Sequence, residues 1–79
     1  MLSPDLRDWL TERVAYYLGE VPERIAPDVP LANYGLDSVY AFVICGDIED
    51  RFGVTVESTL AWDHPTIDAM TEYLNGLAP

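Results

Sequence analysis

Ser38 is the residue of this 79-residue chain whose neighbours best suit chemistry on its side chain. It follows Asp37 and precedes an apolar run at residues 39–44 that has the spacing of a helix. Aspartate is a preferred N-cap, because its carboxylate accepts backbone N–H bonds that a first helical turn leaves unmade. Gly35 gives the approaching loop its backbone freedom. The free N–H groups and the dipole of such a helix start favour an anion, so an attached phosphate would be stabilised there.

Three stretches resemble one protein family, in order and in spacing. Gly-Leu-Asp-Ser at 35–38, followed by a hydrophobic residue, resembles the modification site of acyl carrier proteins, whose serine is esterified with 4′-phosphopantetheine. Residues 50–54 are similar to the end of the helix after that site, and residues 62–67 to the entry into the last helix of polyketide-type carriers. Because the matches extend over most of the chain, they are far more specific than the short motif alone.

The resemblance implies a carrier that holds acyl intermediates as thioesters on a 4′-phosphopantetheine arm attached to Ser38. Asp37 would then be both the helix cap and a contact for the phosphopantetheinyl transferase. The other implied partners are an acyl-loading enzyme, an acyl-AMP ligase or an acyltransferase, and a ketosynthase or another downstream enzyme. Two alternatives stay open: an aminoacyl or peptidyl carrier of a nonribosomal peptide pathway, and an unmodified helical interaction module.

The subclass is also implied by resemblance. Peptidyl carriers usually have Gly-Gly before Asp-Ser, so the motif at 35–38 favours an acyl carrier. Val43 stands where carriers of fatty acid synthesis commonly have glutamate, and Tyr40 where they have an acid or a small residue. Polyketide or related natural-product biosynthesis is therefore the expected pathway. Residues 34–39, 46–50 and 59–63 are similar to carriers loaded by acyl-AMP ligases.

An enzyme interpretation would combine Asp37, Ser38 and His64 into a hydrolase triad. The serine lacks the Gly-x-Ser-x-Gly turn between a strand and a helix. A helical domain of this size has little room for a water-excluded substrate cavity. The single histidine precedes Pro65, where a loop or capping role is more common. We therefore expect no catalysis by the chain itself.

Composition limits the partners and the compartment. The chain has fourteen acidic residues and four basic ones, with a net charge of −10, so nucleic acid and anionic membranes carry the same sign and are poor partners. Basic protein surfaces are the expected targets, although acidity could also simply keep a small protein soluble and monomeric. The single cysteine, Cys45, forms no intramolecular disulfide and no metal-ligand cluster. Without a signal sequence or an apolar membrane span, we expect a cytoplasmic monomer without metal.

The chain predicts one all-α carrier domain over residues 1–79, an acyl-carrier-like bundle of three main helices plus one short helix. Ser3 and Pro4 would start a helix at 4–18, and Asn75-Gly76 would end the last one. Prolines keep the long first loop from forming a helix. Because Met1 opens the chain and Pro79 closes it, a discrete protein is favoured over an excised module. The expected helices lie at 4–18, 38–52 and 67–75, with a short turn at 58–62.

Helical spacing assigns the faces of these elements. The inward positions are expected to be Leu6, Leu10, Val14, Tyr17 and Leu18 in the first helix, Ala41, Ile44, Cys45, Ile48 and Phe52 in the second, and Ile67, Met70, Thr71 and Leu74 in the last. The first loop would be fixed to the bundle by Val21, Ile25, Val29 and Leu31. The bundle would be covered by Leu60 and Trp62.

The outer side of the second helix is the expected partner surface. Val39 and Val43 should be exposed beside Ser38. Gly46 lies on the same side and destabilises the helix by about 1 kcal/mol relative to alanine. Together these residues suggest a surface shaped for close approach by a partner. Exposed valines are also common on protein surfaces and by themselves need no functional explanation. The resemblance to acyl carrier proteins favours a docking surface. The expected partner-binding residues are Val39, Tyr40, Val43, Gly46, Glu49 and Asp50.

Overall fold

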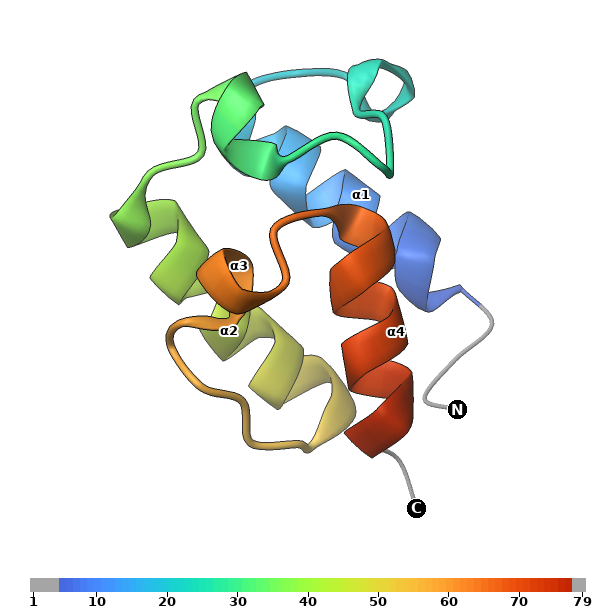
Figure 1. Ribbon diagram of the computed structural model, residues 1–79, viewed down its shortest axis with the longest axis vertical. Helices are drawn as coiled ribbons and strands as arrows, with labels where there is room; N and C mark the ends of the chain where they lie inside the picture. The colour runs from blue at the N-terminus through green and yellow to red at the C-terminus, as the bar shows by residue number, and fades with distance from the viewer. Residues whose placement is uncertain (1–4, 78–79) are drawn as a thin grey trace.

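The structure, a computed structural model, describes residues 5–77 and builds them from four α-helices and two 3₁₀ turns (Figure 1). In chain order these are α1 (Leu6–Leu18), η1 (Pro22–Arg24), η2 (Leu31–Tyr34), α2 (Ser38–Phe52), α3 (Leu60–Asp63) and α4 (Ile67–Leu77). Residues 5–77 include no strand, and residues 54–56 belong to the loop between α2 and α3. The expected all-α bundle of three main helices and one short helix is confirmed.

The ends of the helices follow local rules in most places. Gly53 ends α2 with φ +69°, a left-handed conformation that glycine adopts without strain, and its N–H donates to the carbonyl of Glu49. The predicted start at Ser3 and Pro4 lies outside the described residues. The predicted end of α4 was wrong, because the helix continues through Asn75-Gly76 to Leu77. One glycine costs about 1 kcal/mol in a helix, and here it does not stop the last turn.

The core forms where α1, α2 and α4 face one another. Its fully buried large side chains are Leu6, Leu10 and Val14 of α1, Leu31 of η2, Ile44 and Ile48 of α2, Leu60 of α3, and Ile67, Met70 and Leu74 of α4. Most of the predicted inward positions are therefore confirmed.

Several predicted inward positions differ from the structure. Tyr17, Leu18 and Phe52 are only partly buried at the edge of the core, whereas Ala15 is fully buried. Thr71 is half-buried, and Val29 likewise. Val21 is half exposed, so it does not fix the first loop; Ile25 and Leu31 do.

The expectation that Trp62 covers the bundle was wrong. Its side chain is 51% exposed, whereas Leu60 and Ala61 are buried. The short helix α3 covers Leu60–Asp63 rather than 58–62. Since α3 packs on α2 and buries Leu60 and Ala61, the next residue, Trp62, is turned outward.

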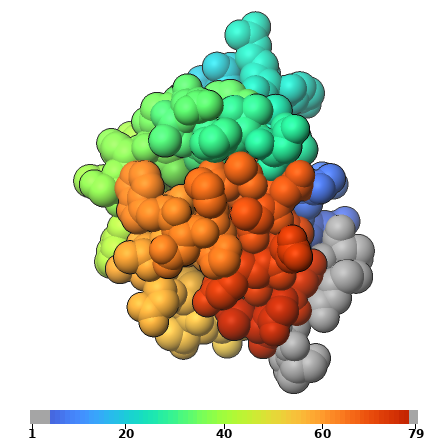
Figure 2. All heavy atoms as spheres, in the orientation of Figure 1, coloured from blue at the N-terminus to red at the C-terminus, as the bar shows by residue number. Residues whose placement is uncertain are grey.

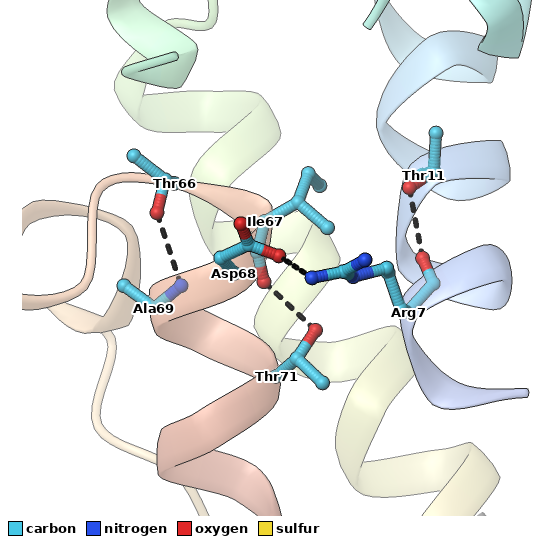
Figure 3. A network of polar contacts seen from close by, with 7 residues as sticks. All are labelled: Arg7, Thr11, Thr66, Ile67, Asp68, Ala69 and Thr71. Atoms are coloured by element: carbon cyan, nitrogen blue, oxygen red, sulfur yellow. Dashed lines mark hydrogen bonds and ion pairs between the residues drawn. The ribbon is translucent and has the colours of Figure 1, made fainter. Parts of the chain in front are cut away.

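Figure 3 shows polar contacts between α1 and α4 and local contacts along each of these two helices. Arg7 of α1 forms an ion pair with Asp68 in the first turn of α4. Thr66 caps α4, because its hydroxyl accepts the N–H of Ala69 at 3.0 Å. The hydroxyl of Thr71 donates to the carbonyl of Ile67 at 2.8 Å, which explains how this side chain stays half-buried.

The first loop lies on the segment that leads into α4 (Figure 2). The N–H of Leu31 donates to the carbonyl of Pro65 at 2.8 Å, and the N–H of Asp68 donates to the carbonyl of Pro27 at 2.9 Å. The first bond fixes η2 and the second fixes the loop before it, and residues 35–37 connect η2 to the start of α2. Among the described helices, none is long and apolar enough to cross a membrane.

Candidate functional site

The loop before Ser38 turns sharply and then extends. Gly35 ends η2 with φ +89°, a conformation that favours glycine, and its N–H donates to the carbonyl of Ala32 at 3.0 Å. Leu36 is buried and anchors the loop to the core. Asp37 is extended, with φ −99° and ψ 176°. The chain therefore reaches α2 with Asp37 at the cap position and Ser38 as the first helical residue.

The predicted cap is present. Asp37 Oδ1 accepts the backbone N–H of Tyr40 at 2.9 Å, and the carbonyl of Asp37 accepts the N–H of Ala41 at 3.0 Å. Ser38 is exposed on this first turn. The backbone N–H groups of Ser38 and Val39 have no partner within the helix, since an α-helix leaves its first N–H groups free. An anion attached to Ser38 fits this position, because these groups and the helix dipole favour negative charge.

Asp37 and His64, which a hydrolase triad would combine with Ser38, make other contacts in the structure. The carboxylate of Asp37 accepts the cap bond. The ring of His64 stacks on Tyr73 of α4, with ring centroids 4.2 Å apart. Both side chains therefore have partners other than Ser38 in the described structure.

The outer side of α2 beside Ser38 is apolar, as predicted. Val39 is 66% exposed, Val43 is 36% exposed, and Tyr40 is also exposed. Phe42 is 66% exposed as well, and it was missing from the predicted partner surface. Helical spacing could have identified it, because it lies four residues after Ser38 and three after Val39, on the same side of the helix.

Gly46 and Asp50 continue this side of α2 and are exposed. A Cβ atom added at Gly46 would have no heavy atom within 4 Å, so contacts inside the domain do not require glycine there. Asp50 forms no ion pair with any residue of the described chain. These two residues therefore remain available to a partner.

The other acids of α2 are engaged within the domain. Glu49 is half-buried, and its Oε2 accepts the backbone N–H of Val56 in the loop before α3, at 2.9 Å. Asp47 forms an ion pair with Arg13 of α1, at 3.0 Å. Of the two acids expected on the partner surface, Glu49 therefore has a partner inside the domain, whereas Asp50 forms no ion pair within the described chain.

A polar and aromatic cluster joins α1 to the same helix. The hydroxyl of Tyr17 donates to Asp47 Oδ2 at 2.5 Å and accepts from Arg13 at 2.9 Å. The bond to Asp47 and burial raise the pKa of Tyr17 above its ordinary value. The ring of Tyr17 stacks on Tyr40, with centroids 5.6 Å apart and an interplanar angle of 24°. Tyr40 therefore combines an exposed surface with a contact to α1.

Comparison with known proteins agrees with this geometry. The family described as "PP-binding: Phosphopantetheine attachment site" matches residues 8–74. The chain is 37% identical, over 75 residues, to one subunit of the phenolphthiocerol/phthiocerol polyketide synthase of Mycobacterium tuberculosis. That match covers 95% of this chain and 4% of the synthase polypeptide, so the chain spans a small part of this curated relative.

Two solved structures are similar in both fold and sequence. One is a free-standing peptidyl carrier protein from a secondary metabolic pathway of Acinetobacter baumannii, with a TM-score of 0.87, 41% identity, and coverage of 90% of this chain and 89% of that one. The other is the acyl carrier protein LipD from Actinoplanes friuliensis, with a TM-score of 0.70, 52% identity, and coverage of 87% and 77%. Since the family match includes most of the described helices and the capped start of α2, this chain belongs to the phosphopantetheine-attachment family and is a non-catalytic carrier.

Proposed function

We propose that Ser38 bears the 4′-phosphopantetheine arm and that the chain carries acyl intermediates on its thiol in polyketide or related natural-product biosynthesis. The observation that carries this proposal is an exposed serine on the first turn of a helix capped by Asp37, within the matched family region. The arm would supply the thiol that forms the thioester. Ser38 needs no internal base, because a separate transferase would act on it.

The acyl class of cargo has more support than the aminoacyl class. The chain is 52% identical to a structure described as an acyl carrier protein and 41% identical to one described as a peptidyl carrier protein. Its Gly-Leu-Asp-Ser sequence at 35–38 also differs from the Gly-Gly-Asp-Ser usual in peptidyl carriers. An aminoacyl cargo is the second candidate, and the free-standing peptidyl carrier of similar fold is the observation in its favour.

The partners would dock on the outer side of α2. Val39, Phe42 and Val43 form an exposed apolar strip beside Ser38, and Asp50 adds a negative charge further along the helix. We propose that the transferase, the loading enzyme and a ketosynthase or other downstream enzyme each offer a hydrophobic patch bordered by arginine or lysine.

Cys45 is a free buried thiol, which suits a reducing cytoplasm.

Intact mass after co-expression with a promiscuous phosphopantetheinyl transferase tests the attachment site. The wild-type protein should gain one phosphopantetheine group, and Ser38→Ala should gain none. Because Ser38 is exposed, the alanine variant should keep wild-type helicity and thermal stability. A modified Ser38→Ala protein would contradict the site. An unmodified wild-type protein would favour the interaction-module alternative.

Loading assays test the cargo and the loading enzyme. We propose that an acyl-AMP ligase loads the arm, using a carboxylic acid and ATP. Each candidate enzyme of the same gene neighbourhood would be offered the phosphopantetheine-bearing protein with labelled acid plus ATP, labelled amino acid plus ATP, or labelled acyl-CoA. Acylation only from the CoA thioester would exclude the ligase and keep the carrier. Loading with an amino acid alone would select the peptidyl class.

A further inference from the structure

Tyr40 takes part in two contacts that meet at the attachment site. Its backbone N–H donates to Asp37 Oδ1 at 2.9 Å, which is the cap bond that encloses Ser38. Its ring stacks on Tyr17 of α1, with centroids 5.6 Å apart. The cap of α2 and a contact between two helices therefore depend on one residue.

Tyr17 is itself held in place from α2. Its hydroxyl donates to Asp47 at 2.5 Å and accepts from Arg13 at 2.9 Å. Arg13 also donates to Asp47 at 3.0 Å. Asp47 lies seven residues after Tyr40, about two helical turns further along the same side of α2. The Tyr17 ring is thus fixed by one turn of α2 and supports another.

The first turn of α2 has little else to hold it. Ser38, Val39 and Tyr40 are all exposed, and Ala41 is the first buried residue of the helix. Helix ends with few buried contacts open more readily than helix centres. A ring stacked on this turn from α1 would oppose such opening.

We propose that Tyr17 is a positioning residue for Ser38. Through the ring of Tyr40 it keeps the first turn of α2 and its Asp37 cap formed, so that the serine is presented to the transferase in one conformation. This inference rests on the proposed attachment at Ser38. It assigns Tyr17 no contact with the transferase or with the phosphopantetheine group.

Amide hydrogen exchange of the unmodified protein tests the structural step. In Tyr17→Leu, the Tyr40 amide should exchange about fivefold faster, the factor that corresponds to loss of a typical cap. Tyr17→Phe keeps the ring without the hydroxyl and should recover part of the protection. The matched control is Thr66→Ala, which removes the cap of α4 and should leave the Tyr40 amide unchanged. Wild-type exchange at Tyr40 in folded Tyr17→Leu protein would overturn the proposal.

Transfer kinetics with CoA and a promiscuous transferase test the functional step. In Tyr17→Leu, kcat/KM should fall, by at most the same factor of about five, because the rate follows the fraction of the protein whose first turn is formed. The effects of Tyr17→Leu and Tyr40→Leu should be coupled, so that the double variant is no slower than the slower single variant. Additive effects, or a wild-type rate in Tyr17→Leu, would overturn the positioning role. If Tyr17→Leu fails to fold, Tyr40→Leu removes the same stack from the side of α2 and should give the same faster exchange.

Intact mass of Ser38→Ala and amide exchange at Tyr40 separate the proposed function from this inference. Modification of Ser38→Ala would show that attachment occurs at another residue. Exchange at the Tyr40 amide needs no transferase, so it decides independently whether Tyr17 holds the first turn.

Discussion

The side chain of Glu49 joins α2 to the loop that precedes α3, because its carboxylate accepts the backbone N–H of Val56 at 2.9 Å. Val56 is buried, so this N–H needs a partner inside the protein. Glu49 therefore has a structural role that its neighbour Asp50, exposed and without an ion pair in the described chain, does not share.

The first prediction compares these two acids. Glu49→Ala should lower the free energy of unfolding by about 1–2 kcal/mol, because it removes a charged hydrogen bond to a buried backbone group. Asp50→Ala should change it by no more than about 0.5 kcal/mol. Urea unfolding of both variants measures the difference. Equal effects would show that the Glu49 bond contributes nothing to stability.

The second prediction concerns Gly46. Because an added Cβ would have no heavy atom within 4 Å, Gly46→Ala should stabilise the protein by about 0.5–1 kcal/mol, as the gain in helix propensity. If a partner approaches α2 closely at this position, the same variant should be loaded more slowly. Thermal unfolding and a loading assay measure the two effects separately. Faster or unchanged loading of the stabilised variant would remove Gly46 from the partner surface.

Local rules were enough to predict much of the fold and the centre of the site. The cap at Asp37 and the end of α2 at Gly53 follow from the residues at those positions and their immediate neighbours. The buried side of α2, represented by Ile48, follows from helical spacing over fifteen residues. The same spacing places Phe42 on the exposed side of α2 beside Ser38, although the predicted surface did not include it.

Other features depend on how distant segments meet. The helix α3 has four residues, too few for any periodicity to decide whether Trp62 faces inward or outward. Tyr17 and Asp47 are thirty residues apart, and their bond follows from the packing of α1 on α2. Glu49 looked like a surface acid because the position of the loop at Val56 cannot be read from α2 alone.

The third prediction concerns alkaline pH. The hydrogen bond to Asp47, followed by burial, raises the pKa of Tyr17 above its ordinary value of 10.0. Burial raises the pKa of the Cys45 thiol above 9.0. Both groups are protonated in the folded state, so their contribution to the free energy of unfolding is fully present below their ordinary pKa values. It is lost as the pH rises through their raised pKa values in the folded state. The free energy of unfolding should therefore decline above about pH 9–10.

Substitution separates these two groups. Tyr17→Phe should lower stability near neutral pH, because the hydroxyl bonds are lost, and should also make the alkaline decline less steep. Cys45→Ala should remove the part of the decline that begins at the lower pH. Urea unfolding across the alkaline range provides the measurement. A decline of unchanged slope in the double variant would assign it to other groups.

The fourth prediction separates apolar contact from electrostatic steering in partner binding. Phe42→Ser removes an apolar side chain from the strip beside Ser38, and Val43→Asp places a charge in it. Each should raise the KM for loading about tenfold, the effect of losing a residue that contributes roughly 1.4 kcal/mol at an interface. Because apolar contacts are not screened, this effect should persist at every ionic strength. Asp50→Lys should instead slow loading at low salt and approach the wild-type rate at high salt, since salt screens exposed charges.

Val21→Ser provides the matched control, because Val21 is half exposed in the first loop and belongs to neither the strip nor the cap. It should load at the wild-type rate at all salt concentrations. A salt-dependent defect in Val43→Asp that disappears at high salt would mean that its added charge, and not the loss of apolar contact, is responsible. Phe42→Ser carries no charge, so a wild-type KM in that variant would show that the exposed ring on α2 does not contact the loading enzyme.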